Sequence, residues 1–83
     1  MNWLPWYPFS VRVQLSGLPP EALDTLIELM IRLCTDPYDR MTSMPLPGPG
    51  RKRLAELGDR GWLEFTPDED AGLLRVYRLV WTG

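Results

Sequence analysis

The feature that most constrains the fold is a strongly amphipathic segment at residues 19–35. At roughly 100° per residue its apolar side chains fill an arc of about 200°, and polar and charged side chains fill the remainder. Pro19 and Pro20 suit the first turn of a helix, and Asp36 precedes Pro37, a position that disfavours helical backbone angles. The segment therefore predicts one helix whose apolar face is wider than a small sheet can cover.

The length and composition limit the chain to one small domain. In 83 residues, nine prolines and seven glycines favour short elements joined by stiff turns. No apolar stretch reaches the about 18 residues that a bilayer requires, so we expect no membrane segment. The single Cys34 cannot form an internal disulfide and favours a cytoplasmic location. The absence of histidine excludes imidazole dyads and Cys/His zinc patterns, and we expect no metal and no cofactor.

Residues 1–9 form an aromatic and proline-rich segment ahead of a single domain at residues 10–83. Pro5 and Pro8 favour an extended path for this segment. Its four aromatic side chains are Trp3, Trp6, Tyr7 and Phe9. They form either a strap over the edge of the core or an exposed docking surface. The alternation that follows, with Val11, Val13 and Leu15 on one side, predicts a strand at residues 10–15.

The last third of the chain predicts three short strands, at residues 51–57, 62–66 and 73–81. Turns at residues 58–61 and 67–72 separate them, and residues 38–50 form a proline-rich loop after the helix. The order of strand, helix, loop and three-stranded meander is typical of an α+β fold. We therefore expect one main amphipathic helix packed on an antiparallel sheet, in the order β-α-β-β-β.

A six-residue turn at 67–72 places Thr66 opposite Leu73 and fixes the register of the second hairpin. The inner face then collects Leu63, Phe65, Leu74, Val76 and Val80. The outer face collects Trp62, Glu64, Arg75, Tyr77 and Trp81. In this register Glu64 lies opposite Arg75, and Trp62 lies opposite Tyr77. Both pairs are common sheet stabilisers as well as candidates for a functional surface.

The facing of the first strand of the meander depends on the length of its turn. A three-residue loop at 58–60 places Glu56 and Lys52 on the outer face and Ala55 and Leu57 inside. A two-residue loop reverses the two faces, because a shift by one residue exchanges them. We favour the three-residue loop, which buries Leu57.

The predicted core joins the helix to the inner face of the sheet. Its members are Leu23, Leu26, Ile27, Met30, Leu33 and Cys34 from the helix and Val11, Val13, Leu63, Phe65, Leu74 and Val76 from the strands. The apolar surface of the broad helical face and of the aromatic side chains in residues 1–9 is larger than this core can cover. We therefore expect a homodimer or a stable hetero-complex. The expected interface residues are Trp3, Trp6, Tyr7, Leu29 and Ile31.

The net charge of the chain is not typical of a general nucleic-acid binder. Nine basic against eleven acidic residues give a net charge of −2. The run Arg51-Lys52-Arg53 is more typical of a solvated strand entrance than of a phosphate site. Asp68, Glu69 and Asp70 lack the spacing of a calcium loop and predict a solvated turn.

The element order and the hairpin that ends in Leu-Leu-Arg-Val-Tyr-Arg-Leu-Val-Trp resemble the RelE/ParE superfamily of small bacterial toxins. The resemblance covers about residues 10–81 and lies mainly in element order and size. It implies a toxin module with an antitoxin partner, and either ribosome-associated mRNA cleavage or inhibition of gyrase. The alternative is a non-catalytic protein–protein interaction domain with the same fold.

In catalytic RelE-like toxins the sheet face opposite the helices binds mRNA, so the resemblance assigns roles by position. It implies Glu64 or Glu56 as a base, Arg75 as a phosphate ligand, and Tyr77 as a proton donor or stacking group. It further implies nucleic-acid contacts from Arg51, Lys52, Arg53 and Trp62. The chain departs from the family in being acidic, in showing one clear helix where many members have two, and in having only Thr82-Gly83 after the last strand.

Overall fold

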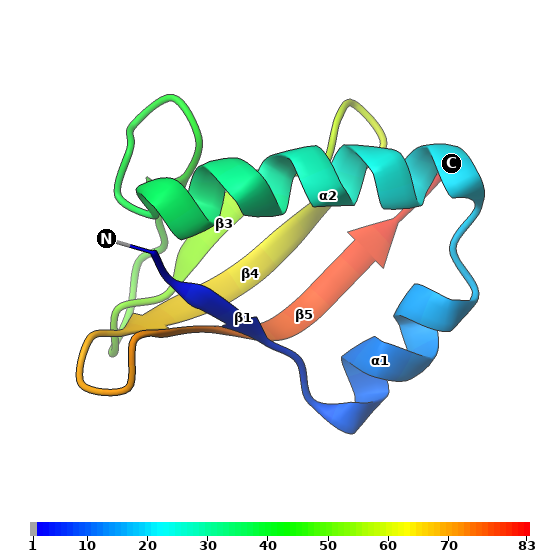
Figure 1. Cartoon of the computed structure of the whole chain (residues 1–83). Coiled ribbons are helices and arrows are strands. Elements are labelled where there is room, and N and C mark those ends of the chain that lie inside the picture. Colours follow the sequence, from blue (N-terminus) through cyan, green and yellow to red (C-terminus); the bar gives the residue numbers. More distant parts are fainter. Residues whose placement is uncertain (1) are drawn as a thin grey trace.

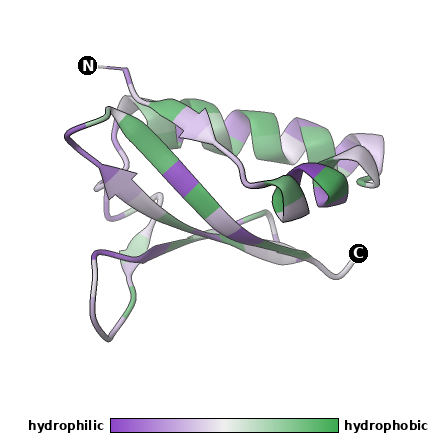
Figure 2. Ribbon diagram, turned by 90° about the horizontal axis from the view of Figure 1, so that it is seen from below, coloured by the Kyte–Doolittle hydropathy of each residue, from purple (hydrophilic) through white to green (hydrophobic). Residues whose placement is uncertain are grey.

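The computed structural model describes residues 2–83 as a five-stranded mixed sheet with two helices on one side (Figures 1 and 2). The elements are β1 (Leu4–Trp6), α1 (Phe9–Ser16), α2 (Pro20–Thr35), β2 (Met44–Pro45), β3 (Arg53–Glu56), β4 (Gly61–Asp68) and β5 (Leu73–Trp81). The strand order is β1-β5-β4-β3-β2. β1 runs parallel to β5, and the remaining neighbours are antiparallel. The expected α+β class is confirmed, whereas the expected purely antiparallel sheet is wrong.

Residues 9–16 form helix α1, so the strand predicted at residues 10–15 is wrong. Pro8 lies in the extended region before the helix, and its carbonyl accepts hydrogen bonds from the N–H groups of Val11 and Arg12. Val11 is buried, whereas Val13 is 53% exposed. A short apolar run with so few turns fits a strand and a helix equally well, and tertiary packing decides between them. The element order therefore starts with a strand and two helices.

Helix α2 confirms the predicted helix, and its buried stripe is narrower than its apolar arc. The stripe consists of Ala22, Leu26, Leu29, Met30 and Leu33. Ile27, which was predicted to be buried, is 57% exposed, and Leu23 and Cys34 are half-buried. Leu29, which was expected in an interface, is only 1% exposed and belongs to the core of this chain.

The hairpin of β4 and β5 is confirmed, but its register differs from the predicted one. The turn is shorter, because Asp68 lies opposite Leu73 and Thr66 lies opposite Arg75. This shift by two residues preserves the faces of the sheet. The predicted inner residues Leu63, Phe65, Leu74 and Val76 are therefore fully buried.

A β-bulge interrupts this hairpin and inverts the alternation of β5 beyond it. Phe65 pairs with Val76 and Glu64 pairs with Arg78, so that Tyr77 is the extra residue. As a result Leu79 is buried in place of Val80. Trp81, predicted on the outer face, likewise packs against the core, and Trp62 lies opposite Val80 instead of Tyr77.

The three-residue loop between β3 and β4 is confirmed. Ala55 and Leu57 are buried, and Glu56 is exposed on the other face. Gly58 begins the loop with a φ of +62°, a conformation that side-chain-bearing residues rarely adopt. Its backbone therefore allows the tight connection that sets the facing of β3.

The N-terminal segment divides its aromatic side chains between the two faces of the sheet. The N–H of Trp3 donates to the carbonyl of Cys34 at 2.9 Å, and its ring meets Tyr38 edge-on at 6.2 Å. Trp3 and Tyr7 pack against the core, which fits the strap interpretation. Trp6 lies opposite Arg75 and remains 40% exposed. Among the described residues, no helix is long and apolar enough to cross a membrane.

Candidate functional site

The outer face of the sheet, which is the face away from α2, gathers most of the polar and aromatic side chains expected in a site. Register and alternation place them there from four strands and the residue before β3. They are Trp6, Lys52, Glu56, Trp62, Glu64, Thr66, Arg75, Tyr77 and Arg78. This surface is the candidate functional site.

Glu64 forms the centre of this surface. Its carboxylate accepts a hydrogen bond from Trp62 Nε1 at 3.1 Å and lies 3.8 Å from Arg78 Nε. The Glu64 side chain is only 17% exposed, whereas Arg78 is 62% exposed. Sequence reasoning missed Arg78, because only the bulge places it opposite Glu64.

Tyr77 lies beside Glu64 and is held as a neutral phenol. Its burial, followed by the negative charge of Glu64, raises the pKa of Tyr77 above its ordinary value. The Lys52 Nζ atom lies 5.2 Å from the centre of the Tyr77 ring, within the range of a cation–π contact. The phenol is therefore protonated at neutral pH, and a cation lies next to it.

Arg75 does not pair with Glu64 as the predicted register required. Its Nε donates to Asp68 Oδ2 at 2.9 Å, and its guanidinium lies 5.4 Å from the centre of the Trp6 ring. The backbone N–H of Ala71 and then Arg75 lower the pKa of Asp68. The structure thus brings Glu64 and Tyr77 together and places Arg75 in a separate cluster at the edge of the sheet.

The three residues of the basic run point to different places. Lys52 reaches the outer face, and Arg51 is exposed. Arg53 donates to Ser43 Oγ at 2.8 Å and to its carbonyl at 3.2 Å, and its guanidinium lies over the ring of Tyr38. Arg53 therefore anchors the loop before β2, which leaves it poorly placed for the predicted nucleic-acid contact.

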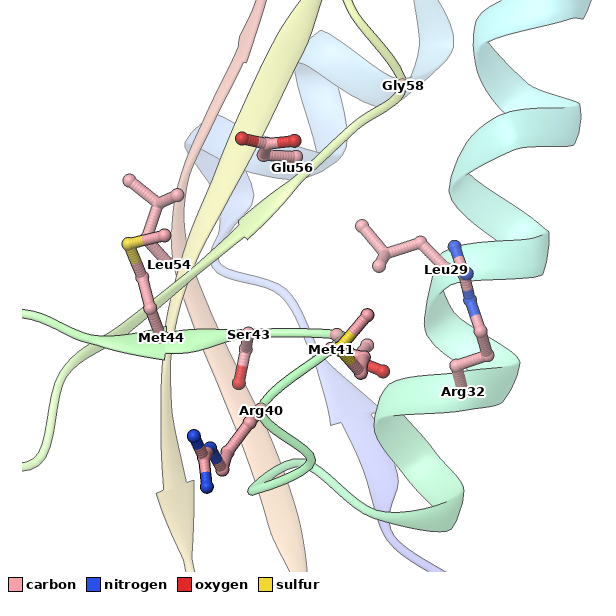
Figure 3. A pocket seen from close by; sticks show the side chains of 10 residues that line it. Leu29, Arg32, Arg40, Met41, Ser43, Met44, Leu54, Glu56 and Gly58 are labelled. Atoms are coloured by element: carbon pink, nitrogen blue, oxygen red, sulfur yellow. The ribbon is translucent and has the colours of Figure 1, made fainter.

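A cavity of about 360 Å³ lies between α2 and the β2–β3 edge and shares only Glu56 with the outer-face residues named above (Figure 3). Arg32 of α2, Arg40 and Glu56 contribute its charged lining. Figure 3 shows these side chains directed apart, so they do not converge on one ligand. Within residues 2–83, no group of three His, Cys, Asp or Glu side chains is placed to hold a metal ion.

Two solved structures are similar to this chain over nearly its full length. One is a chain of the toxin–antitoxin complex RelBE2 from Mycobacterium tuberculosis, with a TM-score of 0.80 and 18% identity, covering 98% of this chain and 99% of that chain. The other belongs to the archaeal RelE–RelB complex from Pyrococcus horikoshii OT3, with a TM-score of 0.77 and 18% identity over 100% and 98%. The chain has the RelE fold.

The RelE fold agrees with the resemblance seen in the order of the C-terminal elements. Helix α1 supplies the second helix that the sequence did not reveal. No family model matches this sequence, and a search of the curated proteins found no match. The RelE fold of this chain is therefore visible in its three-dimensional arrangement and not in a sequence signature.

Proposed function

We propose that this chain is the toxin module of a toxin–antitoxin pair and that it cleaves RNA on the outer face of its sheet. The RelE fold supports the first part, because both similar structures are toxin–antitoxin complexes. One observation carries the second part. The bulge in β5 turns Tyr77 and Arg78 toward Glu64, beside Lys52 and Trp62.

These groups suit cleavage of a phosphodiester by its own 2′-hydroxyl. Glu64 accepts the proton of the 2′-hydroxyl while that oxygen forms a bond to phosphorus. The bond between phosphorus and the 5′-oxygen breaks, and Tyr77 donates its proton to the leaving oxygen. The products are a 2′,3′-cyclic phosphate and a 5′-hydroxyl, so the step needs no water, metal or oxidant.

The basic groups supply the electrostatic part of the reaction. Arg78 lies against Glu64 through Nε, and its large exposure leaves the rest of the guanidinium open to an approaching phosphate. Lys52 adds a second cation over Tyr77. Two cations beside one scissile phosphate stabilise the negative charge that develops on its oxygens.

Induced expression followed by mapping of mRNA ends tests this proposal. The wild-type chain should arrest growth and generate new ends, and the Glu64→Gln and Arg78→Ala chains should not. Glu28→Gln is the matched control, because it removes an exposed carboxylate from α2, away from the outer face. Unchanged cleavage by Glu64→Gln would refute the assignment, and growth arrest with intact mRNA would redirect the target to gyrase or another protein.

We propose that the antitoxin covers the helices and not the outer face. The exposed apolar side chains Ile27 and Ile31 are four residues apart on α2, and Phe9 and Val13 have the same spacing on α1. Two such stripes match an amphipathic segment of a partner protein. Ile31→Lys should weaken the complex with an antitoxin encoded nearby and leave RNA cleavage intact, measured by co-purification and by cleavage in parallel.

A non-catalytic interaction domain is the second candidate function. The observation that favours it is that Arg75 and Arg78 both lie in ion pairs within the chain. In that case the exposed helical stripes carry the whole function, and Ile31→Lys removes it. A chain that binds its partner and leaves RNA uncut would establish this alternative.

A further inference from the structure

Trp6 and Arg75 form a cluster that the proposed cleavage step does not use. β1 pairs with β5 in parallel, so that Trp6 lies directly beside Arg75 on the outer face. The Trp6 residue is 40% exposed, and the Arg75 side chain is 44% exposed. A large aromatic ring and a guanidinium therefore face solvent together at the edge of the sheet.

Arg75 is held in place by an ion pair with Asp68, and its side chain stays partly exposed. Asp68 fixes its Nε at 2.9 Å, and the guanidinium carbon lies 5.4 Å from the Trp6 ring centre. Among the described residues no further side-chain hydrogen bond to Arg75 occurs, and the exposure of its side chain leaves its terminal N–H groups accessible. Guanidinium planes and indole rings are both surfaces on which nucleic-acid bases stack.

A cavity of about 510 Å³ adjoins this cluster and shares Arg75 with it. Arg51 and Thr66 line the cavity together with Pro67 and the three carboxylates of Asp68, Glu69 and Asp70. Its volume falls in the range of about 300–1,000 Å³ that is typical of small-ligand pockets. Its three carboxylates outnumber the two cations Arg51 and Arg75, so the hollow itself does not attract a phosphate, and the contacts with nucleic acid fall to the exposed Trp6–Arg75 pair beside it.

We propose that Trp6 and Arg75 form a subsite for a nucleotide that flanks the cleavage position in a single-stranded RNA. The base stacks on the Trp6–Arg75 pair, and the terminal N–H groups of Arg75 contact the adjoining phosphate. Arg75 and Arg78 are about 10 Å apart along β5, so a short RNA reaches both places. This inference rests on the proposed action on RNA and adds the edge strand β1 to the binding surface.

The test measures binding of a fluorescein-labelled 2′-O-methyl oligouridylate by anisotropy. This probe lacks the attacking hydroxyl, so binding is observed without cleavage. Trp6→Ala should weaken binding about fivefold to a hundredfold, the cost of losing one base–aromatic stack, whereas Trp6→Phe should retain most of the affinity. Arg75→Ala should reduce the dependence of log affinity on log salt by about 0.7, as expected for one lost phosphate contact.

Phe9→Ala is the matched control, because Phe9 is an aromatic residue that is 79% exposed on α1. It should leave binding unchanged, and thermal melting should show each variant folded. Equal binding by wild type and Trp6→Ala would overturn the subsite and leave the proposed cleavage standing. A wild-type chain that neither binds nor cleaves RNA would overturn both. Loss of antitoxin binding or self-association on Trp6→Ala, with RNA binding intact, would assign Trp6 to a protein contact instead.

Discussion

Two adjacent residues of α2 provide a direct test of which helical face holds the fold together. Leu26 is 5% exposed and packs in the core, whereas Ile27 is 57% exposed. Leu26→Ala removes a buried side chain and should lower the free energy of unfolding by about 2–5 kcal/mol. The total free energy of unfolding of a chain of 83 residues is about 4–12 kcal/mol, so this substitution removes a large fraction of it.

Ile27→Ala is the internal control for this experiment. Its side chain is largely in water, and alanine is the better helix former, so the free energy of unfolding should change by about 0.5 kcal/mol or less. Urea denaturation measures both variants, and Leu26→Ala should also lower the Tm by at least about 8 °C. Equal losses for the two variants, or a larger loss for Ile27→Ala, would refute the assignment of the buried face. A loss for Ile27→Ala that appears only when the antitoxin is bound would support the exposed stripe as its contact.

Three further predictions concern the turns and anchors of the sheet. Gly61→Ala adds a Cβ that meets the backbone of β5, so we expect a chain that fails to fold or melts at a much lower temperature in circular dichroism. Arg53→Ala removes both hydrogen bonds to Ser43 and should cost about 1–3 kcal/mol in urea denaturation, with faster proteolysis of the loop before β2. The lowered pKa of Asp68 means that its contacts with the Ala71 N–H and with Arg75 stabilise the chain above about pH 4 and are lost as the pH falls further. In Asp68→Asn the free energy of unfolding should therefore fall less steeply than in the wild type as the pH is lowered below about 4.

The elements with long and strong periodicity were predictable from the sequence. Helix α2 repeats its apolar pattern over several turns, and β4 and β5 alternate over enough residues to define an inner face. Helix α1 was not predictable, because its eight residues have too few repeats to separate a period of 2 from one of 3.6. The two-residue strand β2 is too short to carry any pattern.

The candidate site was only partly predictable for a related reason. Glu64 and Tyr77 were identified because a shift by two residues in the hairpin does not change their face. The partner of Glu64 depends on the exact register, and so Arg78 was missed and Arg75 was assigned in its place. The role of Trp6 depends on β1 joining β5, a long-range parallel pairing that local sequence does not encode.

The bulge links the core of this protein to its candidate site. Val76 and Leu79 are both buried, although they are three residues apart on one strand. A regular strand has a period of two and cannot point both side chains inward, so one extra residue is required between them. That extra residue is Tyr77, and its insertion aligns Arg78 with Glu64. Packing on the inner face therefore determines which groups meet on the outer face. A regular strand that buried Val80 in place of Leu79 would direct Arg78 inward, away from Glu64, and place a charge in the core.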